Sequence, residues 1–244
     1  MRRFVIAFIL LMCASLDAQN DSSQVLLRRI DAYRVPYEQF LVRTRLTAYE
    51  GEKAEETALF NAYLNGDEKS LVVQNEGKNR DMKILYVEGK MWVQLPSSRR
   101  PIRITPVQRL MGQASNGDVA MVSYGDDYAA EPMGDATIDG VDCRKLLLLA
   151  RKQSATYHKI FLYVRKSDYR PVKAEFFLVS GKHFKTAWYE VYTRIGDRMI
   201  LTRMTINDEM RKDQKTVFEY EMIQEKHIDA KYFNKNYLVH VRGL

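Results

Sequence analysis

The stretch that decides the fold is HKIFLYVRKSDYRPVKAEFFL, residues 158–178. Apolar side chains recur at every second position in its first part, from Ile160 to Val164, and again from Val172 to Phe176. This period of two is typical of β-strands that bury one face and expose the other. The residues between the two parts, Lys166-Ser167-Asp168, have turn chemistry. The stretch therefore predicts an antiparallel hairpin with one apolar side and one charged side.

The same signals continue along the chain in both directions. Alternation recurs in residues 40–48 and 216–222, and glycine-containing turn signals separate the apolar stretches. About eleven or twelve strands fit between residues 37 and 224, and a meander of that length must curl to bury its apolar face. We therefore predict a mainly β protein with a few helices, built on a curled antiparallel sheet. The turn signals are Asn65-Gly66, Glu88-Gly89, Asp139-Gly140, Ser180-Gly181 and Gly196-Asp197.

Residues 96–134 depart from this pattern. They are rich in proline and glycine, contain Met111, Met121 and Met133, and show no apolar–polar alternation that continues for the length of a strand. Long irregular insertions in compact β domains are commonly lids or binding loops, so we predict a lid here. A curled sheet with a methionine-bearing lid would enclose a pocket that can repack around alkyl chains. The pattern therefore indicates a hydrophobic ligand.

The N-terminus has the layout of a secretory signal peptide. Arg2 and Arg3 precede an apolar run that is too short to span a bilayer. Cleavage after Ala18 would leave residues 19–244, which we expect to form a single domain exported by the Sec route to the periplasm. Acylation of Cys13 at a lipoprotein cleavage box stays open as an alternative. We expect transient membrane contact and a monomer.

Composition and motifs favour binding over catalysis. A net charge of +7 that is spread along the whole chain indicates solubility rather than nucleic-acid binding. The four histidines are not spaced as metal ligands, and we expect His158 to be a core or rim residue. Asp126 and Asp127 fit solvated turns, and Cys143 fits a buried position on a strand. We predict no catalytic residue, metal or cofactor.

Several blocks of sequence resemble, in order, those of the outer-membrane lipoprotein-sorting protein family, the LolA-like domains. The resemblance covers roughly residues 71–223, and several blocks in order are more specific than one motif alone. The blocks are MWVQLPSSRRPIRI (91–104), MGQASNGDVAMVSYGDDY (111–128), IDGVDCRKLLL (138–148), YVRKSDYRPVKAEFF (163–177), KTAWYEVY (185–192), ILTRMTI (200–206) and KTVFEYE (215–221).

This resemblance implies a LolA/LolB-like half-barrel, closed by helices and a lid, whose apolar interior shields the acyl chains of a lipoprotein or lipid in transit through the periplasm. It also implies an inner-membrane transporter as a candidate partner. The alternative is an accessory protein that docks on an inner-membrane exporter without enclosing lipid. The family offers no catalytic residue and no cofactor.

We expect the pocket and lid to be formed by apolar side chains from both halves of the chain. Arg99, Arg100 and Arg103 are expected on the rim, where the lid leaves the sheet and could meet anionic headgroups or an acidic partner. A solvated basic turn is the alternative for these arginines. The expected pocket and lid residues are Met91, Val93, Leu95, Leu110, Met111, Met121, Ile160, Leu162, Phe176, Met204 and Phe218.

Overall fold

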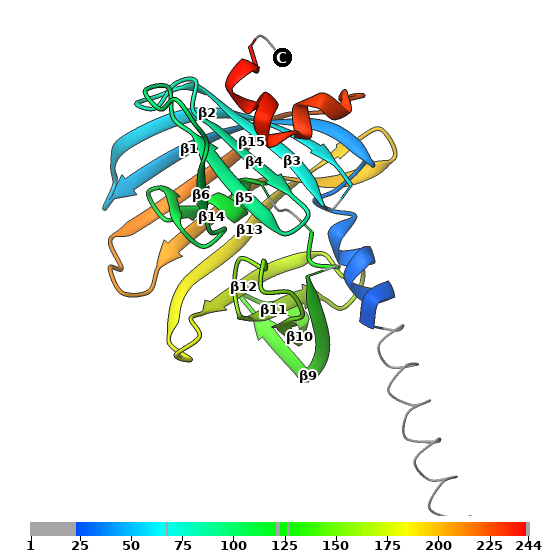
Figure 1. The fold of residues 1–244 in the computed structure, drawn as a ribbon. Helices are drawn as coiled ribbons and strands as arrows, with labels where there is room; N and C mark the ends of the chain where they lie inside the picture. Colours follow the sequence, from blue (N-terminus) through cyan, green and yellow to red (C-terminus); the bar gives the residue numbers. More distant parts are fainter. Residues whose placement is uncertain (1–22, 67, 121–122, 126, 243–244) are drawn as a thin grey trace, which may run out of the picture.

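The protein is built around one antiparallel sheet of thirteen strands (Figure 1). The computed structural model describes residues 23–66, 68–120, 123–125 and 127–242. The predicted signal peptide, with Cys13 and Ala18, and the predicted lid residue Met121 lie outside these ranges. The strands of the first half are β1 (Gln39–Glu50), β2 (Lys53–Asn65), β3 (Lys69–Glu76), β4 (Lys83–Val87), β5 (Lys90–Gln94) and β6 (Ile102–Ile104).

The second half supplies the other seven strands of the sheet. They are preceded by a two-stranded ribbon, β7 (Arg109–Met111) and β8 (Ala114–Ser115), and by the short helix α2 (Asn116–Ala120). The seven strands are β9 (Tyr128–Ile138), β10 (Val141–Ala150), β11 (Lys159–Arg165), β12 (Pro171–Phe177), β13 (His183–Ile195), β14 (Arg198–Asp208) and β15 (Gln214–Glu225).

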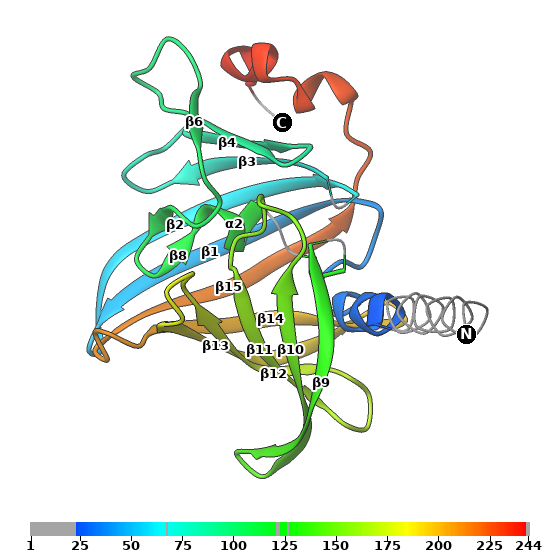
Figure 2. The same ribbon diagram turned by 60° about the horizontal axis from the view of Figure 1, so that its bottom comes forward.

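The two halves meet in the middle of the sheet. Strands β1 to β6 run outward to one edge, and the chain then restarts at the opposite edge with β9 and returns through β10 to β15. There β15 pairs with β1, with Phe218 opposite Leu46. The edge strands β6 and β9 do not pair, so the sheet curls without closing. Figure 2 shows β8 and α2 inside this curl.

The predicted antiparallel meander and its turns are confirmed. At Glu88-Gly89 the φ angles are 48° and 75°, and at Asp139-Gly140 they are 47° and 79°. Two consecutive positive φ angles define the hairpin turn that matches the twist of its strands. The expected number of strands was too low, since the sheet has thirteen.

The extent of the predicted lid was wrong. Residues 128–134 are the first part of the regular strand β9, and residues 102–104 form β6. Pro132 and Gly134 are untypical of strands, so the sequence did not predict β9. Proline is tolerated there because β9 is an edge strand. The irregular part that spans from one edge of the sheet toward the other is residues 105–120, which we call the crossing segment.

Both faces of the curled sheet are covered, but by different elements. On the concave face, the N-terminal helix of residues 23–31 buries Leu27 and Ile30 completely. On the convex face, the C-terminal 3-10 helices η1 (Ala230–Phe233) and η2 (Lys235–His240) bury Phe233 and Leu238 in a second, smaller core (Figure 1). No helix among the described residues is long and apolar enough to cross a membrane.

Candidate functional site

The candidate site is the concave face, where one apolar cluster joins both halves of the sheet. All ten expected pocket and lid residues that the structure describes lie in this cluster or pack against it. Their role in binding a ligand stays a prediction. The buried members are Met91, Met111, Ile160, Leu162, Phe176, Met204 and Phe218, and the half-buried ones are Val93, Leu95 and Leu110.

The crossing segment lies over this face and is attached to it by both apolar and polar contacts. Val119 and Ala120 of α2 are buried in the cluster. The backbone N–H of Gln113 donates to the hydroxyl of Thr216 on β15 at 2.7 Å, and the Gln113 side chain donates to Gln214 at 3.0 Å. Polar contacts of this kind exchange for water at a net cost of only about 1 kcal/mol each.

A second polar attachment joins α2 to β13 and to the loop before β11. The ammonium group of Lys185 donates to the hydroxyl of Ser115 at 2.7 Å and lies 4.0 Å from Asp118. Tyr157 donates its phenol O–H to Asp118 at 2.7 Å, and the Ser115 backbone N–H donates to the same carboxylate at 2.8 Å. Burial lowers the pKa of Lys185, although the nearby Asp118 opposes that shift. The charge of Asp118 is therefore well compensated.

Among the described residues, two cavities of about 20 and 30 Å³ lie within the cluster, each enough for about one water molecule. Phe218 lines the first cavity, and Phe176 and Met204 line the second. Arg34 and Asp118 line both. Neither cavity could hold an alkyl chain unless the side chains around it moved apart.

Asp31, at the end of the N-terminal helix, binds residues 123–125, which follow the crossing segment. Its carboxylate accepts the backbone N–H groups of Tyr124 and Gly125, at distances down to 2.8 and 2.7 Å, and the hydroxyl of Ser123 at 2.9 Å. Burial raises the pKa of Asp31 to about 6, although Arg34 and these hydrogen bonds lower it. The carboxylate is thus hydrogen-bonded but poorly solvated.

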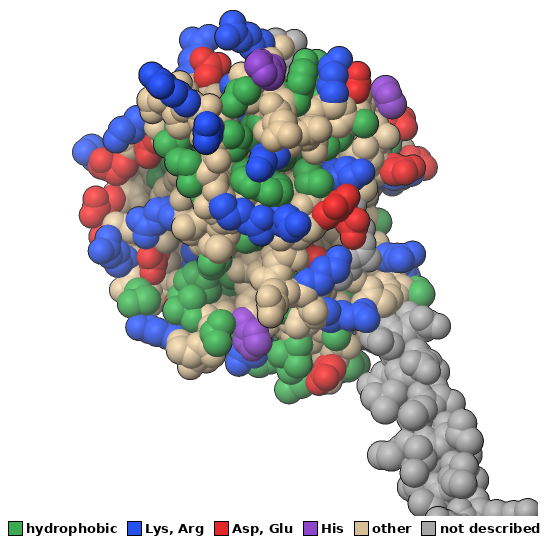
Figure 3. All heavy atoms as spheres, viewed as in Figure 1, with side chains coloured by type: hydrophobic (Ala, Val, Ile, Leu, Met, Phe, Trp, Pro, Cys, Tyr) green, Lys and Arg blue, Asp and Glu red, His purple; other side chains and the backbone are tan. Residues whose placement is uncertain are grey.

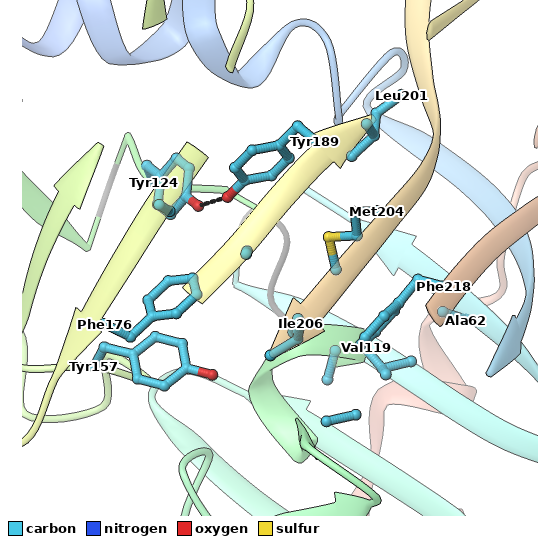
Figure 4. Packing of buried hydrophobic residues seen from close by; sticks show 14 of the residues in the cluster. Ala62, Val119, Tyr124, Tyr157, Phe176, Tyr189, Leu201, Met204, Ile206 and Phe218 are labelled. Carbon is cyan, nitrogen blue, oxygen red and sulfur yellow. Dashed lines mark hydrogen bonds between the residues drawn. The ribbon is translucent and has the colours of Figure 1, made fainter. Parts of the chain in front are cut away.

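Arg34 lies beside a pair of hydrogen-bonded tyrosines. Its guanidinium carbon is 4.7 Å from the centre of the Tyr124 ring and 6.0 Å from that of Tyr189. The hydroxyls of these tyrosines are 2.5 Å apart (Figure 4). Sequence reasoning missed this cluster. One usable signal was the inward position of Tyr189 in its strand alternation, and the others were Asp31 and Arg34 at the end of an amphipathic helix.

The three predicted rim arginines lie around the edge from which the crossing segment departs. Arg103 is on β6 and stacks over Trp92, 5.0 Å from the ring centre. Arg99 lines a groove of about 620 Å³ next to the C-terminal residues Val241 and Arg242, and Arg100 is exposed. Figure 3 shows basic side chains spread over the face viewed, with acidic ones among them. Their position at the rim of a pocket and their contact with a membrane or partner stay predictions.

The candidate catalytic groups of the described residues lie in different surroundings. Cys143 is fully buried, as expected. His158 was expected in the core or at the rim, and it is exposed, so the core position was wrong. The expectation of a solvated turn was wrong for Asp127, which is buried and pairs with Lys152 at 3.5 Å. Among the described residues, which do not include Asp126, no group of three His, Cys, Asp or Glu side chains could hold a metal ion.

The chain is similar to a known protein family and to proteins of known structure. A family model described as "Uncharacterized protein" matches residues 66–240. No curated protein matches the chain. A crystal structure of a LolA superfamily protein from Nitrosomonas europaea is 33% identical, with a TM-score of 0.82, and the match covers 88% of this chain and 98% of that one.

Two further structures share the fold at lower identity. A putative outer membrane lipoprotein-sorting protein domain from Vibrio parahaemolyticus is 16% identical, with a TM-score of 0.74 over 90% of this chain and 99% of that one. A DUF1329 family protein from Desulfovibrio piger is 19% identical, with a TM-score of 0.73 over 90% and 98%. Given the identity and coverage of the Nitrosomonas europaea protein, the chain belongs to the LolA superfamily.

Proposed function

We propose that the protein is a periplasmic, non-enzymatic carrier that shields the acyl chains of a lipoprotein or lipid during transfer to the outer membrane. In this proposal residues 1–18 are a cleaved signal peptide, and residues 19–244 act as one binding domain with transient membrane contact. The observation that carries the proposal is an apolar concave face on a sheet whose edges β6 and β9 do not pair. Membership of the LolA superfamily supports it.

In this proposal loading opens the concave face, because neither of the two cavities described above, of about 20 and 30 Å³, can hold an acyl chain. The crossing segment is the natural moving part. It is short, it spans from one edge of the sheet toward the other, and several of its attachments are hydrogen bonds that water can replace. Each methylene that it covers after loading contributes about 0.8 kcal/mol, which offsets the packing that opening disrupts.

A disulfide that can be formed and reduced tests whether the crossing segment opens. A Cβ placed on Gly117 of α2 would lie 2.9 Å from the Cβ of Thr156, and a disulfide needs about 3.5–4.5 Å. The double variant Gly117→Cys/Thr156→Cys therefore needs a small outward shift to form the bond, and Thr156→Cys replaces the hydroxyl group, which the added Cβ would overlap, and the methyl group, 2.8 Å from that Cβ, with a single sulfur. Cys143 is buried and will not compete.

The oxidised double variant is expected to bind a fluorescent acyl probe at least tenfold more weakly than the same protein after reduction. The reduced form serves as the matched control, and Thr156→Cys alone controls for oxidation. Equal binding by the locked and reduced forms would sink the moving-lid mechanism. If the unmodified protein is recovered without lipid by native mass spectrometry and binds no acyl probe, the carrier proposal itself fails in favour of a docking protein.

A further inference from the structure

Arg34 is the cationic group placed at the centre of the concave face. It follows the N-terminal helix, and its guanidinium carbon lies 4.7 Å from the ring centre of Tyr124. It lines both interior cavities, one on the side of β1, β2, β14 and β15, the other on the side of β12 and β13. Arginine keeps its charge even when buried. A permanent positive charge therefore borders both spaces into which a ligand could expand.

One of its nitrogens has no partner. The Nη1 atom of Arg34 is buried and makes no hydrogen bond to any described residue. Buried donors are almost always satisfied, and a charged donor left without an acceptor is costly. A single water in the adjacent cavity could satisfy it while the protein is empty. A ligand oxygen would satisfy it better, because the acceptor would then carry a compensating charge.

The neighbouring carboxylates are already engaged by other donors. Asp31 accepts from Ser123, Tyr124 and Gly125. Asp118, which lines the same cavities, accepts from Ser115 and Tyr157 and lies 4.0 Å from the ammonium group of Lys185. Because Asp118 is on α2, displacement of the crossing segment would also remove it from the side of Arg34. Opening would thus leave Arg34 with more unbalanced positive charge than the closed state has.

The first cavity beside Arg34 is mostly apolar, whereas Ser123, Asp127 and Thr156 also line the second. Figure 4 shows the tyrosine pair Tyr124 and Tyr189 near Leu201 and Met204, with Phe218 and Val119 beyond. A cation at one end of an apolar space is suited to a ligand with a charged end and an alkyl chain. The residues that line the first cavity include Val42, Ala62, Leu64, Val119, Leu201 and Phe218.

The geometry points to Arg34 as the residue that binds an anionic oxygen, of a carboxylate or a phosphate, at the polar end of an amphiphile whose alkyl chain lies against the concave face. This assignment rests on the carrier function and adds the chemical class of the ligand head to it. The protein therefore discriminates between amphiphiles of equal chain length by the charge of their heads.

Binding of three probes with the same fourteen-carbon chain tests the assignment: myristate, tetradecyl phosphate and tetradecanol. The variants are Arg34→Met, which removes the charge and the donors, and Arg34→Lys, which keeps the charge. Arg198→Met is the matched control, because Arg198 is exposed and lines neither cavity. Affinity is measured by displacement of a fluorescent acyl probe, and thermal unfolding reports on the fold of each variant.

The wild-type protein and Arg198→Met are expected to bind at least one anionic probe about tenfold or more tightly than tetradecanol. Arg34→Met is expected to lose that preference and to bind tetradecanol within about twofold of the wild-type affinity. Arg34→Lys is expected to retain part of the preference. Whether myristate or tetradecyl phosphate binds better identifies the head. Equal binding of all three probes by the wild-type protein would overturn the assignment, leave the carrier function intact and mean that Arg34 holds a water only. Failure of all three probes to bind would overturn both.

Discussion

Substitution of Asp31 by asparagine is predicted to change how the stability of the protein depends on pH. The Asp31 carboxyl is 5% exposed and has a pKa raised to about 6, with burial as the main cause. In the unfolded chain its pKa returns to about 3.8. Between these two values the folded protein holds one more proton than the unfolded chain does. Stability contributed by this group is therefore gained as the pH falls through 6 and lost as it rises.

The magnitude follows from the two pKa values. The difference of 6 − 3.8, at 1.36 kcal/mol for each pKa unit, means that ionised Asp31 disfavours the folded state by about 3 kcal/mol well above pH 6. At pH 5 part of that penalty is already relieved, because the folded carboxyl is mostly protonated. From pH 8 to pH 5 the relief amounts to about 1.4 kcal/mol. Asparagine has a similar shape and no charge, so Asp31→Asn should lack this gain.

The measurement is the free energy of unfolding in urea at pH 5, 6, 7 and 8 for both proteins. Other titrating groups cancel in the difference between wild type and Asp31→Asn, which should shift by about 1.4 kcal/mol in favour of wild type as the pH falls from 8 to 5. Asp197→Asn is the control, because the Asp197 side chain is 94% exposed, and its difference should stay constant. A shift of the opposite sign for Asp31→Asn would mean that the hydrogen bonds from Ser123, Tyr124 and Gly125 outweigh burial, and the reasoning would be refuted.

Three further predictions concern packing on and around the concave face. Phe218→Ala should lower the free energy of unfolding by about 3–5 kcal/mol, because the side chain is fully buried; a loss below 1 kcal/mol in urea unfolding would contradict its place in the core. Gly112→Ala should loosen the crossing segment and increase the binding of an apolar dye, because the new Cβ would overlap the Thr216 hydroxyl and lie 2.7 Å from the Ala48 Cβ. Gly134→Ala is the control, since Gly134 also has a positive φ but an added Cβ there meets nothing within 4 Å. Equal dye binding by the two variants would contradict the prediction. Arg103→Gln should lower the melting temperature only slightly, since an exposed cation–π contact such as that with Trp92 contributes about 0.5–1 kcal/mol, and a large drop would show that Arg103 has an additional structural role.

The strands could be predicted because their information is local. In β11, Ile160 and Leu162 face the concave side, as their spacing of two residues requires, and Phe176 pairs with Ile160 across the predicted hairpin. The turn at Asp139-Gly140 was equally local, because only a few residue types adopt two consecutive positive φ angles. Such features depend on neighbours within one hairpin, and the sequence displays them directly.

The convex face was harder to predict because its apolar residues depend on the chain's end. Leu71 and Leu85 point away from the concave cluster, yet both are fully buried, because η1 and η2 cover that side of the first strands. In sequence these strands contain continuous apolar runs, LVV and ILYV, which is the pattern of strands buried on both faces. The alternation of the later strands, which have one charged face, does not extend to them.

The contacts of the polar cluster could not be predicted because its partners are far apart in the chain. Asp31 binds backbone groups about 93 residues away, and Tyr124 meets Tyr189 across 65 residues. These contacts arise only because the meander returns to β1, which brings the N-terminal helix beside both the crossing segment and β13. No spacing rule within a single element reports such a meeting. The buried concave-face residues of the strands were accessible through alternation, whereas the contacts of Arg34 required the topology.

A concave face that is covered by the protein's own side chains is compatible with a carrier when that cover is exchangeable. In the closed state Leu110, Met111 and Val119 cover the concave face, so the protein does not expose a large apolar surface to water while it is empty. If an acyl chain enters beneath the crossing segment, these side chains pack against the acyl chain in place of the sheet, and little apolar area is exposed in either state. The free-energy difference between the empty and loaded states then stays small, which transfer between two membranes demands, because the acyl chain must leave as readily as it arrives. A permanently open pocket would lack this balance, since the empty carrier would either aggregate or hold its cargo too tightly.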